Sequence, residues 1–232
     1  MAEMDFLRDL AKKTLTVPIP STKLDHYFWG RAQRLVRNVE YICQLPEIIN
    51  ANLPIDRFCL IAATYFNDAG LADQFKKEKN GTKFSVNGGN DDELMDICAQ
   101  VVEEKLQPHL DQARIKKIIR IIAESNSHLT RMTEAMILSD ARNLDDMGTT
   151  GIVNELRRYI IEGKCVSDLL QIWKRKIDYG YWQARLKESF RFQAVRKVAE
   201  QRLSTAKYFM NQLEAEIKAE DLEELSIHST FV

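Results

Sequence analysis

The sequence contains no apolar run of about 18 residues, the length that a membrane-spanning helix requires. Proline and glycine are scarce, with five and nine residues among 232. These two residue types interrupt helices most often, so their scarcity permits long helical segments. The first nine residues are acidic and amphipathic, unlike a secretory signal, which is basic and then apolar. We therefore expect a cytoplasmic protein without a membrane partner.

The four cysteines, Cys43, Cys59, Cys98 and Cys165, are widely separated in the sequence. The lack of a CxxC spacing excludes the common zinc and redox motifs. Because the cysteines lie in segments with a helical pattern, we predict that they are small buried apolar side chains. The glycines do not form a phosphate-binding loop of the Walker or dinucleotide type.

Hydrophobic residues make up 45% of the chain and recur at helical spacing almost everywhere. Alternating strand patterns are nearly absent, so the sequence predicts an all-α fold. The expected helices cover residues 24–45, 54–68, 91–106, 111–125, 133–146 and 150–162. Residues 76–92 are polar and contain glycine, which predicts a loop.

After a first unit at 1–165, the pattern from Val166 to residue 232 predicts a long C-terminal helical arm, bent at Gly180. One apolar stripe along the arm follows three-four spacing. It consists of Phe192, Val195, Ala199, Leu203, Ala206, Met210, Leu213 and Ile217. A continuous helix over 181–218 would be about 57 Å long, which exceeds the expected diameter of the domain. The stripe therefore packs on its own domain or forms a homodimer through residues 181–218.

The net charge of −1 hides an uneven distribution along the chain. Residues 157–207 contain thirteen lysines and arginines against five acids, and residues 208–232 contain one against six. A basic surface attracts nucleic acid or another anion. The alternative is a solvated helix face that is compensated by the acidic tail or by a second subunit.

Two segments carry polar residues in the order of a known motif. Residues 62–70, AATYFNDAG, are similar to the pattern AALLHDIG, and residues 134–148, EAMILSDARNLDDMG, are similar to a DAD-R-LD pattern. Both patterns are typical of HD-domain phosphohydrolases, which this chain resembles over residues 22–165. The resemblance implies an HD-domain-like helical bundle.

The family holds a divalent metal with two histidines and two aspartates, and the metal-bound water attacks a phosphoester. Such a site uses the lone pairs of imidazole and carboxylate, while the ion lowers the pKa of the water. In this chain Asp68 matches the aspartate of the His-Asp pair, but Asn67 replaces the histidine. Arg142 stands at the final aspartate, and a guanidinium has only donors, so it cannot be a ligand.

The first ligand position can be assigned in two ways. Residues 25–35, DHYFWGRAQRL, are similar to the family's HDWxHxxRV start. Matching Trp29 and Arg34 places Arg31 at the ligand histidine, which we favour, whereas choosing the nearest histidine selects His26. Either alignment leaves too few ligands for tight metal binding.

The substitutions suggest that an arginine replaces the metal. Asp68 needs a partner if it is buried, and Arg142 can supply the charge; Asp145, three residues after Arg142, is a second candidate partner. With Arg31 and Arg34 also pointing inward, the pocket would hold a phosphate or carboxylate. The alternative is that Arg142 and Asp68 form an internal ion pair that closes the cavity.

We therefore expect a non-catalytic HD-fold protein that binds an anionic small molecule or serves as a regulatory or assembly component, with no cofactor. The rival interpretation is an active phosphohydrolase for a nucleotide or another phosphoester, with a divalent metal held by other residues. Those residues would be His26, Asp68, Asp140 and His128. A third possibility is nucleic-acid binding by the basic arm.

Overall fold

The computed structural model describes residues 2–18, 24–77 and 91–222. Within these ranges the fold is all-α apart from one small sheet, which confirms the predicted fold class. The predicted loop at 76–92 falls mostly outside the described residues. In the described part of the chain, no helix is long and apolar enough to cross a membrane.

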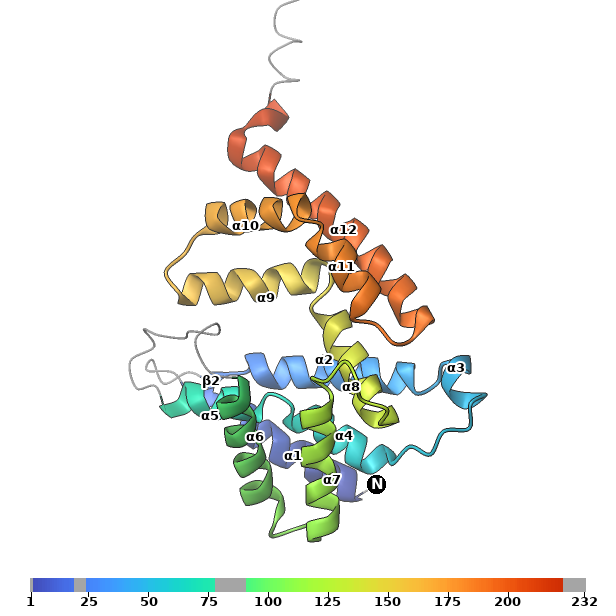
Figure 1. Cartoon of the computed structure of the whole chain (residues 1–232). Coiled ribbons are helices and arrows are strands. Elements are labelled where there is room, and N and C mark those ends of the chain that lie inside the picture. Colours follow the sequence, from blue (N-terminus) through green and yellow to red (C-terminus); the bar gives the residue numbers. More distant parts are fainter. Residues whose placement is uncertain (1, 19–23, 78–90, 223–232) are drawn as a thin grey trace, which may run out of the picture.

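The helices form two layers (Figure 1). The lower layer contains α1 (Ala2–Leu15), α2 (Tyr27–Ile42), α3 (Pro46–Ile49), α4 (Arg57–Phe66), α5 (Ala69–Lys77), α6 (Asp91–Leu106), α7 (Gln112–Glu124) and α8 (Thr133–Asp145). The upper layer contains α9 (Gly148–Ile161), α10 (Val166–Asp178), α11 (Tyr181–Glu188) and α12 (Gln193–Lys218), followed by a 3-10 turn at Glu220–Leu222. The strands β1 (Val17–Pro18) and β2 (Leu24–Asp25) pair antiparallel before α2.

Helix α4 lies at the centre of the lower layer, where it contacts α1, α2, α7 and α8. Its residues from Cys59 to Phe66 are all buried, as expected for a helix that is apolar on every side. It begins later than the predicted start at Pro54, because Asp56 is the N-cap and accepts a hydrogen bond from the backbone N–H of Cys59 at 3.0 Å. Helix α2 is also shorter than predicted, since residues 24–25 form β2.

The C-terminal arm is three helices rather than one. The bend at Gly180 is confirmed, with φ of +66°. The predicted continuity over 181–218 is wrong, because the chain leaves the helical conformation between α11 and α12. Phe190 and Phe192 are buried in this break, so their side chains join the core. The arm therefore folds back on the molecule.

The apolar stripe of α12 packs against α9 within the same chain. Its members from Phe192 to Met210 are buried, while Ile217 near the end is 49% exposed. The stripe therefore needs no second copy to cover it, and the homodimer stays a prediction. Three cysteines are buried as expected, but Cys165 is exposed at the start of α10.

Helices α5 and α6 approach each other closely at Gly70. A Cβ atom at this position would lie 2.8 Å from the carbonyl oxygen of Leu94 and 3.0 Å from the amide nitrogen of Cys98. Gly70→Ala should therefore lower the free energy of unfolding by about 1–3 kcal/mol, measured by urea denaturation. Gly30→Ala is the matched control, because a Cβ there meets no atom within 4 Å. That change should stabilise α2 by about 0.5–1 kcal/mol, and equal effects of the two variants would contradict the close packing.

Candidate functional site

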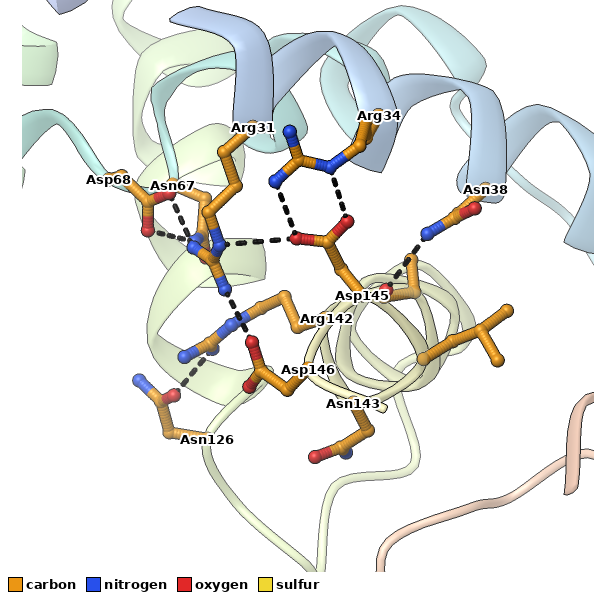
Figure 2. A network of polar contacts seen from close by, with 12 residues as sticks. Arg31, Arg34, Asn38, Asn67, Asp68, Asn126, Arg142, Asn143, Asp145 and Asp146 are labelled. Carbon is orange, nitrogen blue, oxygen red and sulfur yellow. Dashed lines mark hydrogen bonds and ion pairs between the residues drawn. The ribbon is translucent and has the colours of Figure 1, made fainter. Parts of the chain in front are cut away.

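The six residues predicted to form the pocket lie together at the junction of α2, the end of α4 and the end of α8 (Figure 2). They are Arg31, Arg34, Asn67, Asp68, Arg142 and Asp145. Arg31 and Arg34 lie one turn apart on α2, so both face the same neighbours. Asn67 and Asp68 follow α4 directly, while α8 carries Arg142 and Asp145.

Arg31 forms the centre of a cluster of carboxylates. Its Nη1 donates to Asp68, its Nε lies 3.5 Å from Asp145 and its Nη2 lies 3.4 Å from Asp146. The side chains of Arg31, Asp68 and Asp145 are only 13%, 6% and 3% exposed. Burial lowers the pKa of Arg31, but the surrounding carboxylates, Asp68 first, outweigh this effect and raise the pKa above its ordinary value. The guanidinium is therefore charged and well compensated.

Two further arginines complete the cluster. Arg34 donates to both oxygens of Asp145, at 2.8 and 3.2 Å, in the bidentate geometry that favours this pair. Arg185 of α11 donates to Asp146 at 3.1 Å and to Asn143 at 3.2 Å. Burial acts to raise the pKa of Asp146, but Arg31 and Arg185 outweigh it and lower the pKa. The contact through Arg185 fastens the upper layer to the lower one.

Arg142 has different partners from those predicted. It does not pair with Asp68 or Asp145, because Arg31 and Arg34 already occupy those carboxylates. Its Nη1 donates instead to the side-chain oxygens of Ser125 at 3.0 Å and Asn126 at 2.6 Å. Burial and the neighbouring Arg31 lower the pKa of Arg142. Since both acceptors are neutral, Arg142 is the guanidinium of the cluster that lacks a carboxylate within ion-pair distance among the described residues.

Arg31, and not His26, contacts Asp68 in the structure. His26 is the N-cap residue of α2, where its Nδ1 lies 3.5 Å from the Thr16 hydroxyl. His128 is exposed in the connection between α7 and α8. Neither histidine appears in the carboxylate cluster. Within the described ranges, no group of three or more His, Cys, Asp or Glu side chains is arranged to hold a metal ion.

Asp140 has a structural contact instead of a place in the cluster. Its side chain is fully buried and accepts hydrogen bonds from the backbone N–H groups of Arg191, at 2.9 and 3.1 Å, and Phe192, at 3.0 Å. It thereby holds the break that precedes α12. The interpretation of Asp140 as a metal ligand is not supported by this geometry, because both oxygens accept hydrogen bonds from the backbone.

The Asp140 contact should produce a pH-dependent stability. Burial raises the pKa of Asp140 to about 6, although the two N–H groups act to lower it. Between about pH 4 and pH 6 the folded protein therefore holds a proton that the unfolded chain releases. The free energy of unfolding then falls as pH rises, by up to about 1.4 kcal/mol per pH unit. Asp140→Asn removes this titration, so the stability of the wild type relative to the variant should decrease over this interval in urea denaturation. Parallel pH profiles would contradict the assignment.

A cavity of about 370 Å³ lies beside the cluster, between the two layers. Arg31, Asp68, Arg142 and Asp146 line one side of it. The other side comes from the upper layer and includes Asn154, Glu155, Arg157, Arg158, Lys176, Tyr181, Trp182 and Arg185. The lining therefore has six basic residues against three acidic ones, and its aromatic residues add an apolar part. A volume of this order is typical of small-molecule sites.

The sequence predicted site residues on the lower-layer side of this cavity and none on the upper-layer side. Of the upper-layer residues, those of α10 and α11 lie outside the segment that resembles HD domains, whereas those of α9 lie inside it but outside its motifs. The excess of lysine and arginine from Arg157 onward was the sequence feature that could have indicated these residues. Several of its members are taken up by ion pairs: Arg157 with Asp25, Lys176 with Glu155 at 2.6 Å, and Arg185 with Asp146. Nucleic-acid binding stays a prediction.

Solved structures with the same fold are known. The chain is similar to YpgQ from Bacillus subtilis, with a TM-score of 0.59, 17% identity and coverage of 94% of this chain and 98% of that chain. A crystal structure of YpgQ in complex with ADP matches with a TM-score of 0.56, 17% identity and coverage of 93% and 97%. The Lin1889 protein from Listeria innocua matches with a TM-score of 0.55, 19% identity and coverage of 94% and 98%. No family model matches the sequence, and a search of curated proteins finds no match.

These likenesses concern the fold alone, because the identities are low. Their coverage exceeds nine tenths of this chain, so they extend well beyond residue 165 into the C-terminal helices. The upper layer is therefore part of the shared fold and not an addition to it.

Proposed function

We propose that this chain is an HD-like protein without a metal centre, which binds an anionic small molecule in the cavity between its two layers. It would act as a ligand-binding or regulatory component and not as a hydrolase. The observation that carries the proposal is Arg31, which lies among Asp68, Asp145 and Asp146 and supplies positive charge to that cluster. Because these carboxylates are bound to guanidinium groups, their oxygens are engaged.

The electrostatic balance of the cavity supports an anionic ligand. Six basic residues face three acidic ones in the lining, and Arg142 has only neutral acceptors. A partly buried guanidinium without a carboxylate gains from an anion that replaces lost hydration. Phosphate and carboxylate oxygens match guanidinium donors in geometry as well as in charge.

The aromatic residues favour a ligand that is more than a bare ion. Tyr27, Phe28, Tyr181 and Trp182 contribute ring surface to the same cavity. A nucleotide combines a flat base with phosphate oxygens and so suits both parts of the lining. The complex of YpgQ with ADP makes ADP a reasonable first probe.

The test is isothermal titration of the full-length protein with ADP, AMP, adenosine and inorganic phosphate. We expect ADP to bind more tightly than adenosine, and Arg142→Met to weaken ADP binding about tenfold through the loss of a charge-assisted contact. Arg37→Met, an exposed arginine of α2, is the matched control and should leave the affinity unchanged.

The rival hydrolase is tested on the same preparations. Metal content by plasma mass spectrometry, on protein purified without chelator or metal-affinity tag, should be well below one equivalent. Close to one equivalent of Mn, Fe, Ni or Zn, together with phosphatase activity that Asp68→Ala abolishes, would decide for the hydrolase. No binding of any of the four probes would reject the proposed ligand class.

A further inference from the structure

The side of the cavity formed by the upper layer contains hydrogen-bond donors that have no acceptor. The buried Nδ2 of Asn154 and the buried Nε1 of Trp182 have no hydrogen-bond partner within the described part of the chain. The Nε of Arg158 is in the same condition, since Glu162 lies 3.9 Å away, beyond hydrogen-bond distance. All three residues line the cavity, and Trp182 is only 5% exposed.

Unpartnered donors of this kind point to a missing acceptor. Buried polar groups in native proteins nearly always have a partner, in the protein, in ordered water or in a bound molecule. An indole N–H and a guanidinium N–H can only donate, and the Nδ2 of an asparagine donates as well. The group that completes them must therefore present several acceptor atoms close together, as the oxygens of a phosphoryl group do and an ammonium group does not.

The three donors come from positions that the fold brings to one side of the cavity. Asn154 and Arg158 are four residues apart on α9 and so lie on one face of that helix. Trp182 belongs to α11, where its ring packs against Trp173 of α10 with the centroids 5.1 Å apart. The ammonium group of Lys176 lies 5.5 Å from the centroid of the Trp182 ring, which adds positive charge beside the indole. The packing holds the indole rigidly in place.

We propose that Asn154, Arg158 and Trp182 form the subsite that binds the phosphoryl oxygens of the ligand. This inference rests on the proposed function and adds to it a location, because the anion then binds to α9 and α11 of the upper layer. The cluster of Arg31 and Asp68, where the HD resemblance would place the chemistry, lies on the other side of the cavity. The two layers therefore have different tasks: the lower one carries the neutralised carboxylates, and the upper one recognises the anion.

The test compares two tryptophan variants of the full-length protein by titration with ADP and with inorganic phosphate. Trp182→Phe keeps the aromatic ring but removes the N–H donor, so it should weaken ADP binding about tenfold or more. Trp29→Phe, which changes a buried tryptophan that stacks on Tyr65 and does not line the cavity, should change the affinity less than about twofold. Asn154→Ala should weaken ADP binding in the same way as Trp182→Phe. Because Asn154 is half-buried, this variant still tests the subsite if Trp182→Phe fails to fold.

The outcomes separate this inference from the proposed function. Binding by the wild type that is equally strong in Trp182→Phe and Asn154→Ala would overturn the subsite and leave the proposed function standing. A wild type that binds neither probe would overturn both. Weakened binding of ADP and of inorganic phosphate alike would assign the donors to phosphoryl oxygens, whereas an effect on ADP alone would assign them to the nucleoside and reject the subsite as stated.

Discussion

Replacing Arg31 by methionine should lower the free energy of unfolding by about 3–5 kcal/mol, the range found when one partner of a buried ion pair is removed. Methionine fills a similar length of space, so the loss is mainly electrostatic. Asp68 is 6% exposed and would keep only the amide of Asn67, which donates to it at 2.8 Å. Asp145 would keep its ion pair with Arg34, so Asp68 is the carboxylate that loses its cation. Urea denaturation followed by circular dichroism measures the change.

Two controls decide whether the buried pair is the cause. Arg37→Met removes an exposed arginine from the same helix and should change stability by no more than about 0.5 kcal/mol. The double variant Arg31→Met with Asp68→Asn should recover much of the loss, because no unpaired carboxylate remains. A loss below about 1 kcal/mol in Arg31→Met, or no recovery in the double variant, would show that the cluster does not hold the fold together.

Truncation of Leu203 should be the other large effect. This residue lies in the middle of the α12 stripe, is 4% exposed and belongs to the helix face that packs on α9. Leu203→Ala leaves a cavity in that contact and should cost about 2–5 kcal/mol. For a chain of this size each kcal/mol corresponds to roughly 2–4 °C in the melting temperature. Differential scanning calorimetry measures the shift directly.

The same experiment distinguishes packing within the chain from packing in a dimer. If α9 covers the stripe in the same chain, the melting temperature of Leu203→Ala should not depend on protein concentration, and the chain should remain one species by size. A dimer through residues 181–218 would make the melting temperature rise with concentration. Tyr208→Ala, at a position of α12 that is 74% exposed, is the matched control and should have little effect.

The proposed absence of a metal centre and the proposed binding of an anion are compatible in one fold, since function resides in the site and not in the architecture. Here three of the positions that resemble an HD metal site hold a neutral amide and two guanidinium groups, and the lining of the neighbouring cavity has six basic residues against three acidic ones. The polar cluster fastens α2 to α8 and, through Arg185, to α11. The cluster therefore links the two layers beside the cavity.

The resemblance to HD domains implied that the predicted pocket residues gather in one place. Asn67 and Asp68 follow a buried helix and Arg142 and Asp145 share another, and local patterns alone do not say that these helices meet. The pairing was predicted wrongly. The guanidinium groups of Arg31 and Arg142 both lie near enough to Asp68 to influence it electrostatically. The relative position of α2 and α8 decides that Arg31 donates to Asp68, while Arg142 donates to Ser125.

The sequence by itself determined the helical class of the fold and the bend at Gly180, because periodicity and glycine conformation are properties of local sequence. Only the tertiary structure decided the break before α12, which depends on the distant Asp140. It also decided the cavity and the unpartnered donors of Asn154 and Trp182. These features arise where helices far apart in the chain approach within a few ångströms, and no local pattern encodes such distances.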